Sequence, residues 1–277
     1  MKKFIFIMMA AGLILASCNT NKEVTNPFFA EWDTPFGVPP FDRIGNDHYM
    51  PALDSAIVIA RAEINAIASG TEEPTFENTV AAYDRGGELL MRVMYVFGSQ
   101  SSANTNDTLQ ALEVEMAPKL AASSDEVMLN ANLFGRIKTV YDNRESFTLT
   151  PEELFILENL YKNFVRSGAL LGPEDQEVLK KLNQEISVLT VKFSQNVLAE
   201  TNDFKLVIDN EADLKGLPEN VIAGAAAMAA ESGNEGKWVF TTQKPSMLPF
   251  LTYAEKRDLR KTLYDAYLTR GNHDNQY

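Results

Sequence analysis

The feature that most constrains the fold is a long stretch, residues 173–201, with the apolar spacing of an α-helix. Apolar side chains recur at intervals of three and four residues, at Leu179, Leu182, Ile186, Leu189, Phe193 and Val197. This spacing puts them on one face of a helix. Gly172-Pro173-Glu174-Asp175 is a typical helix start, with proline at the first helical position and acids in the first turn. At 1.5 Å per residue, such a helix is about 40 Å long.

Most of the chain after residue 45 has the same periodicity. The best-defined start is Thr150-Pro151-Glu152-Glu153, a capping box. The pair Gly86-Gly87 costs roughly 1 kcal/mol per glycine inside a helix and suggests a bend or the close approach of another helix. In the helix predicted over 77–97, Val80, Tyr83, Leu90, Val93 and Met94 are expected to point inward. The polar run 98–107 predicts a break. Helices are therefore predicted over residues 46–70, 77–97, 109–116, 127–141 and 150–168.

The pattern changes after residue 201. Residues 204–209 and 237–243 have the composition and alternation of strands. A helix is predicted to begin at Pro218-Glu219 between them, and a final helix near Thr252, after the segment "KPSMLPF". We therefore expect a mainly α fold with a small β element near residues 204–243.

The N-terminus has the pattern of a secretory signal. Residues 1–18 carry two lysines, an apolar run, and small residues before Cys18, the only cysteine of the 277 residues. Leu15-Ala16-Ser17-Cys18 resembles the bacterial lipobox, which predicts lipidation at Cys18, followed by a polar tether over residues 19–27. The alternative is a lone buried cysteine near an ordinary signal peptide. With lipidation, the protein would be anchored in the bacterial cell envelope as a periplasmic or outer-membrane lipoprotein.

Composition limits the partners. With 45% apolar residues, the chain can bury a substantial core. Its formal charge of −13, from 38 acidic and 25 basic residues, argues against nucleic acid or an anionic membrane surface as a partner. We expect contact with a membrane only through the lipid anchor.

The residues alone show no catalytic site. Zinc hydrolysis most economically uses two histidines one helical turn apart, but the chain has only His48 and His273. Neither belongs to an HExxH motif, and His48 is expected to cap or pack at a helix start. No G-x-S-x-G elbow or Gly-rich phosphate loop is present. The sequence therefore offers no candidate catalytic, metal-binding or cofactor-binding residue.

One basic cluster stands out in this acidic chain. Lys256, Arg257, Arg260 and Lys261 lie together on the last predicted helix. Arginine suits a substrate's C-terminal carboxylate because its planar fork can bind both oxygens. The preferred interpretation is a solvated face, or a partner for acidic helices nearby.

Several segments nonetheless occur in a recognisable order. They are "FDRIGNDHYMPAL", "PTFENTV", "SSANTNDTLQALEVEMAPKLAASSDEVMLNANLFGRI", "NFVRSGALL" and "KWVFTTQKPSMLPFLTYAEKRDLRKTLYDAYLTRG". Together they resemble the bacterial dipeptidyl carboxypeptidases and oligopeptidase A, in the thimet oligopeptidase family of zinc metallopeptidases. The likeness covers roughly residues 27–275, and "SANTND" and "FVRSGA" favour the dipeptidyl carboxypeptidase branch.

This resemblance implies a mainly helical enzyme whose narrow channel admits oligopeptides and excludes folded proteins. It also implies zinc on an HExxH helix, where the intervening glutamate activates water. No residue of this chain matches that motif, so no catalytic residue is transferred. The chain is expected to be the N-terminal half, with a channel-wall domain over 28–201 and the start of the catalytic part over 202–277.

Two functions follow from these expectations. In the first, the chain is part of a zinc-dependent peptidase that removes C-terminal dipeptides from oligopeptides, inactive without its C-terminal catalytic half. His273 then lies in a connecting turn, and apolar surface meant for burial is exposed. In the second, the chain is a stand-alone helical lipoprotein that binds peptides or a partner protein without catalysis.

Overall fold

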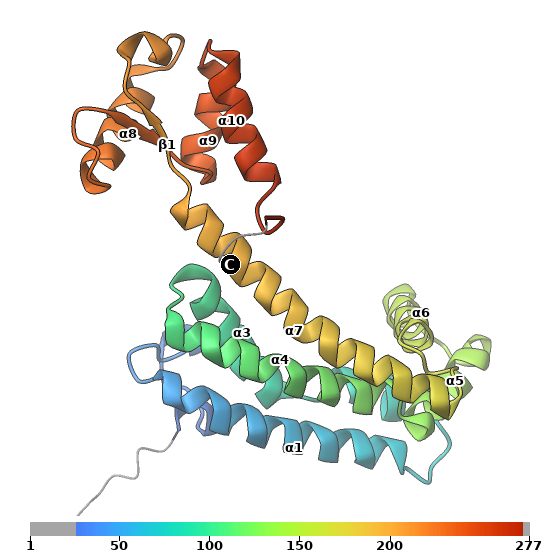
Figure 1. The fold of residues 1–277 in the computed structure, drawn as a ribbon. Coiled ribbons are helices and arrows are strands. Elements are labelled where there is room, and N and C mark those ends of the chain that lie inside the picture. Colours follow the sequence, from blue (N-terminus) through green and yellow to red (C-terminus); the bar gives the residue numbers. More distant parts are fainter. Residues whose placement is uncertain (1–25, 274–277) are drawn as a thin grey trace, which may run out of the picture.

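The computed structural model describes residues 26–273 (Figure 1). The fold is mainly helical with one small sheet, as predicted. Cys18, the predicted lipidation site, lies outside the described residues. The α-helices are α1 (Tyr49–Ala68), α2 (Ala82–Asp84), α3 (Glu88–Ala103), α4 (Asp107–Met128), α5 (Ala131–Asp142), α6 (Pro151–Arg166), α7 (Pro173–Asp203), α8 (Glu219–Glu231), α9 (Lys244–Tyr253) and α10 (Arg257–Leu268), and the strands are β1 (Leu206–Ile208) and β2 (Trp238–Phe240).

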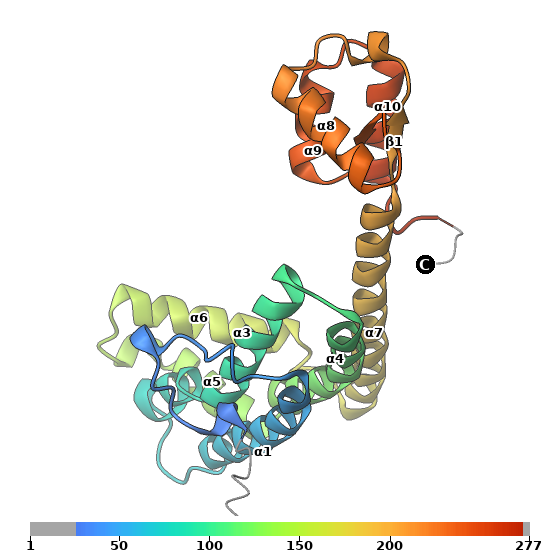
Figure 2. The ribbon, with the colours of Figure 1, turned by 90° about the vertical axis from the view of Figure 1, so that its left-hand side faces the viewer.

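Helices α1 to α6 form one packed body, in which α1 lies against α3 and α4, and α5 lies against α6 (Figures 1 and 2). One core cluster surrounds Tyr49, whose buried ring meets the edge of Phe97 with their centroids 5.2 Å apart. A second cluster joins α5 and α6 around Ile137 and Phe164, both fully buried. The inward positions of the predicted amphipathic pattern therefore supply this core.

The predicted capping box at the start of α6 is confirmed. The Thr150 hydroxyl accepts a hydrogen bond from the Glu153 backbone N–H at 3.2 Å, and the Glu153 carboxylate accepts from the Thr150 N–H at 2.7 Å. These bonds satisfy N–H groups that a helix start leaves unpaired. The cap thereby fixes where α6 begins and which of its residues face the core.

Two boundary predictions near the glycine pair were wrong. The helix predicted over 77–97 is broken at Gly87, where φ is +74°, because a left-handed residue cannot continue an α-helix. Before the break lies a short π-helical turn, Phe76–Ala81, followed by α2. The polar run 98–107 was predicted to be a break, but α3 continues through it to Ala103. Its serines bond backward to carbonyls within the helix and do not end it.

Helix α7 has the predicted length, and its apolar face points away from α4. It packs along α4 through the opposite, more polar side, where Asn183 donates to the buried Asp125 carboxylate at 2.7 Å. Gln195 likewise donates to the Gln110 carbonyl at 2.9 Å. The residues with the strongest apolar periodicity are about half exposed and form what we call the α7 stripe: Leu182, Ile186, Leu189 and Phe193.

The distal lobe, residues 204–268, lies at the C-terminal end of α7, away from the body (Figure 2). Strands β1 and β2 form the predicted small β element and pair antiparallel, with Val207 opposite Val239. The sheet, α8, α9 and α10 share a core around Phe240 and Phe250, both buried. The final helix was predicted to begin near Thr252, after the segment "KPSMLPF". This segment is itself helical and lies inside α9, whose first turn accommodates a proline that needs no N–H partner, and the final helix, α10, begins at Arg257.

The end of α10 is tied back to the end of α7. The Glu200 carboxylate accepts a hydrogen bond from the Gly271 N–H at 2.8 Å, and the Arg270 guanidinium donates to the Thr201 hydroxyl at 2.7 Å. Glu200 is buried at this joint, so its charge is held by hydrogen bonds in place of water. Within residues 26–273, no helix is both long and apolar enough to cross a bilayer.

Candidate functional site

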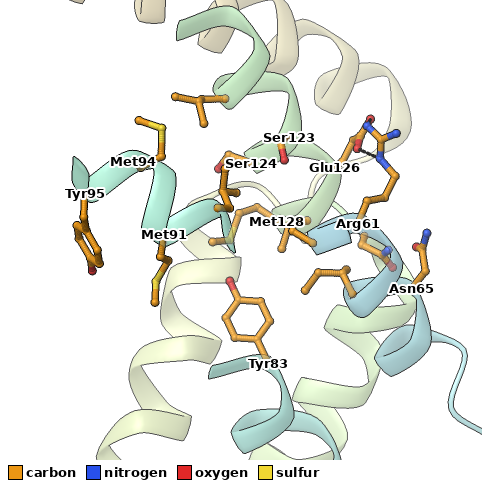
Figure 3. Close-up of a pocket in the computed structure, with 16 residues that line it drawn as sticks. Arg61, Asn65, Tyr83, Met91, Met94, Tyr95, Ser123, Ser124, Glu126 and Met128 are labelled. Atoms are coloured by element: carbon orange, nitrogen blue, oxygen red, sulfur yellow. Dashed lines mark hydrogen bonds and ion pairs between the residues drawn. The ribbon is translucent and has the colours of Figure 1, made fainter. Parts of the chain in front are cut away.

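A cavity of about 680 Å³ opens in the body between α1, α3 and α4, above the side chain of Tyr83 (Figure 3). Its volume lies within the range of pockets that hold small ligands. The helices that form it are held by their own buried clusters, so its walls are part of the packed body. The pocket is the best-formed candidate site in the part of the chain that the structure describes.

Methionines supply much of its apolar wall. Met91 and Met94 come from α3, and Met128 comes from the last turn of α4. Their side chains surround the space above the Tyr83 ring in Figure 3. Unbranched thioether chains adapt to ligands of different shape and make favourable contacts with aromatic rings. The wall is therefore apolar and deformable.

The polar rim is dominated by one ion pair. Arg61 on α1 contacts the Glu126 carboxylate on α4 through Nε at 2.6 Å and a terminal nitrogen at 3.0 Å. Both side chains are about half exposed, so solvent screens the pair, and it contributes at most about 1 kcal/mol to stability. Each charge neutralises the other, and the rim offers no net charge to a ligand.

Tyr83 forms the floor of the pocket. Its ring packs edge-on against Phe164, with the centroids 6.0 Å apart, and its hydroxyl points into the cavity (Figure 3). Burial, with a smaller effect from the neighbouring Asp84 charge, raises the pKa of the Tyr83 hydroxyl. The group therefore stays protonated at neutral pH. It has no hydrogen-bond partner among residues 26–273.

The pocket contains serines but no histidine among its lining residues. Its serines, Ser123 and Ser124, have no histidine beside them to act as a base, because His48 and His273 are not among the lining residues. Among residues 26–273, no group of three or more His, Cys, Asp or Glu side chains is close enough together to hold a metal ion. The described part of the chain thus offers an apolar site with isolated polar groups.

The two histidines lie apart from the pocket. His48 ends the 3-10 turn before α1, and its Nδ1 accepts a hydrogen bond from the Gly45 N–H at 2.9 Å. This confirms the predicted capping role. His273 is exposed in the turn after α10.

The basic cluster at α10 is neutralised in part by neighbouring acids. Lys256 pairs with Asp213 at 2.7 Å, and Lys261 pairs with Asp265 one turn along the same helix. The Arg260 guanidinium donates to the Glu255 carbonyl at 3.1 Å, which does not neutralise its charge. The two lysine pairs agree with the predicted solvated face that partners nearby acids.

Sequence analysis did not identify the pocket. Its lining comes from segments far apart in the chain, and nothing in their periodicity says that α1, α3 and α4 meet. Leu90 and Met94 were predicted to face the core, and they do line the cavity. Two further apolar residues of α3, Met91 and Tyr95, were not among the residues predicted to point inward. They are exposed and line the pocket, so apolar residues off the inward face were the one sequence feature that could have indicated it.

The comparisons with known proteins concern nearly the whole chain. No protein-family profile matches it. It is 39% identical over 246 residues to the dipeptidyl carboxypeptidase of Escherichia coli K12, a match that covers 89% of this chain and 36% of the relative. The dipeptidyl carboxypeptidase of Salmonella typhimurium is 37% identical, with the same two coverages. Oligopeptidase A of Salmonella typhimurium is 28% identical over 90% of this chain and 36% of its own length.

These matches confirm the resemblance stated from the sequence motifs. They extend along most of the chain, and both kinds of relative are peptidases. The chain spans about a third of the length of the curated relatives that it matches.

Proposed function

We propose that this chain is a helical part of a zinc-dependent peptidase that removes C-terminal dipeptides from oligopeptides. The observation that carries the proposal is the 39% identity to a dipeptidyl carboxypeptidase over 89% of the chain. At that identity over a continuous stretch, the shared residues specify the same helices. The oligopeptide substrate is inferred from the activity that the relative's name states.

The zinc of such an enzyme does not fit the described residues. A catalytic zinc needs three protein ligands that converge on one point. His48 uses Nδ1 for its cap, and residues 26–273 hold no metal-binding group of His, Cys, Asp or Glu. In the proposed enzyme, zinc and the water-activating base therefore belong to polypeptide outside residues 26–273, and the printed sequence contains no HExxH motif that could supply them. The 277-residue chain alone is then inactive.

The α7 stripe supports this division. Ile186, Leu189 and Phe193 are each more than half exposed, although apolar residues with this spacing usually face a core. Contiguous exposed apolar surface usually marks a place where protein is buried. In the proposed enzyme, the catalytic part covers the stripe.

The test begins with the DNA beyond codon 277. If the reading frame continues and encodes HExxH, the longer polypeptide is expected to release C-terminal dipeptides and to lose this activity with a chelator. The matched control is residues 1–277 alone, assayed with added zinc, which should release none. A stop codon followed by an unrelated gene, or zinc-dependent release by the 277 residues alone, would contradict the proposal.

In the proposed enzyme, Cys18 carries a lipid anchor that holds the protein at the bacterial cell envelope. The supporting observation is the lipobox-like Leu15-Ala16-Ser17-Cys18 followed by a polar tether. Mass spectrometry of the protein from bacterial membranes should find a diacylated N-terminal cysteine. Cys18→Ser should release the protein into the soluble fraction, and recovery of the unmodified cysteine in the wild-type protein would refute lipidation.

The pocket favours one alternative, a helical lipoprotein that binds a ligand without catalysis. The supporting observation is the 680 Å³ cavity, into which the Tyr83 hydroxyl points without a partner among the described residues. The two functions differ in one respect. The binding protein needs no further polypeptide, whereas the peptidase requires the zinc-bearing part.

A further inference from the structure

We propose that the pocket between α1, α3 and α4 binds a small, neutral, mostly apolar ring compound whose single hydrogen-bonding group reaches the Tyr83 hydroxyl. This inference does not depend on peptide hydrolysis. It depends on the size of the pocket, the charge at its rim and the one polar group at its floor.

The rim selects for a neutral ligand. The Arg61 guanidinium is engaged by both oxygens of the Glu126 carboxylate, at 2.6 and 3.0 Å. Because the two charges neutralise each other, the rim gives no net electrostatic attraction to a charged ligand, which would also lose hydration on entering the apolar cavity. A neutral ligand leaves this ion pair undisturbed.

The floor selects for one polar group. The Tyr83 hydroxyl points into the cavity and has no hydrogen-bond partner among the described residues, so it is available to a ligand donor or acceptor. The hydroxyl can both donate and accept, so it does not restrict the ligand to one kind of group. Met128 and Met91, near the ring in Figure 3, would surround the remainder of the ligand.

Size and wall chemistry favour rings. A cavity of 680 Å³ exceeds the needs of a single water cluster or an amino-acid side chain and suits a compound of two or three rings. Thioethers contact aromatic faces and edges favourably. Tyr95 lies exposed at the pocket, where its ring can cover the outer part of the ligand.

The test uses N-phenyl-1-naphthylamine, a neutral ring compound with one N–H that fluoresces in apolar surroundings. Titration of the monomeric protein should give saturable binding with one dye per chain. Tyr83→Phe keeps the ring packing against Phe164 and removes only the hydroxyl. It should weaken binding about 2- to 10-fold, the value of one hydrogen bond. Ala60→Leu fills the cavity from α1 and should weaken binding further, with an unchanged far-ultraviolet circular dichroism spectrum as the check on folding.

The α7 stripe is the competing dye site, so Leu189→Ser is the matched control. Under the proposal, Leu189→Ser leaves the saturable site unchanged. Absence of saturable binding would overturn the proposal. It is also overturned if Leu189→Ser removes the site while Tyr83→Phe and Ala60→Leu leave it intact.

Discussion

The replacement of Gly216 by alanine should destabilise the distal lobe more than other glycine replacements. Gly216 lies in the turn before α8 with φ at +91°, a left-handed conformation that side chains rarely adopt. A Cβ there would lie 2.3 Å from the Tyr253 carbonyl oxygen. That oxygen belongs to the main chain at the end of α9, where the Glu255 N–H donates to the Lys215 carbonyl at 2.9 Å. The neighbour therefore cannot move without breaking this connection.

Gly233 provides a matched control for the magnitude. It lies in the same lobe with φ at +73°, but a Cβ there would meet nothing within 4 Å. Gly233→Ala should therefore lower the free energy of unfolding only by the left-handed penalty, about 1–2 kcal/mol. Gly216→Ala adds a steric clash with the main chain, which should lower the free energy of unfolding by about a further 1–3 kcal/mol, the usual effect of overpacking.

The assay can be confined to the distal lobe. Trp238 lies in β2, and Trp32 is the only other tryptophan, in the body. In a Trp32→Phe background, tryptophan fluorescence during urea unfolding reports on the lobe alone, for the parent chain and both glycine variants. If the two variants lose the same free energy within about 0.5 kcal/mol, the inferred contact with Tyr253 is refuted.

Three further predictions concern buried polar groups and the α7 stripe. Asn183→Ala should lower the free energy of unfolding, measured in urea, by about 1–3 kcal/mol. The substitution removes the hydrogen bond to the buried Asp125 carboxylate, whose other oxygen already lacks a partner. Asp125→Asn removes the buried charge and should lower the free energy of unfolding by less. Burial raises the pKa of Tyr83 in the folded state, so above about pH 10 the unfolded chain loses the hydroxyl proton more readily than the folded chain. The free energy of unfolding should therefore fall as the pH rises above this value. In Tyr83→Phe it should fall less over the same pH range. The purified chain should self-associate and bind additional hydrophobic dye, beyond the saturable pocket site, at the exposed α7 stripe. Leu189→Ser should reduce both the self-association and this additional binding. A monomer that unfolds cooperatively and binds no dye beyond the pocket site would contradict this.

Local signals predicted much of the fold because the interactions behind them are local. The capping box at Thr150 and the start of α7 at Pro173 depend on residues within one turn. The strand pair follows from alternation at two short segments. The backbone conformation at Gly86-Gly87 was harder to predict, because a glycine pair permits a bend, a close contact with another helix or a break in the helix. Only the tertiary contacts of the flanking segments select the break at Gly87.

The candidate site could not be predicted in the same way. A pocket depends on where helices fail to fill the space between them, and periodicity describes one helix at a time. Tyr83 was predicted to point inward, and it does pack on Phe164. Its free hydroxyl, however, is known only once α1, α3 and α4 are arranged around it. A methionine is also equally compatible with a core and with a pocket wall.

The exposed apolar face of α7 has a physical consequence. Periodicity identified this face correctly, but it could not say whether the covering surface lies within residues 26–273. Complete burial of a leucine, isoleucine or phenylalanine contributes about 1.5–3 kcal/mol, and the four stripe residues are each about half exposed. About 3–6 kcal/mol of stabilisation therefore remains available to any polypeptide that covers the stripe. This is a large share of the roughly 5–15 kcal/mol that stabilises a typical domain. Under the proposed function, the rest of the peptidase would cover this half-exposed side, while the polar side of the helix stays packed on α4.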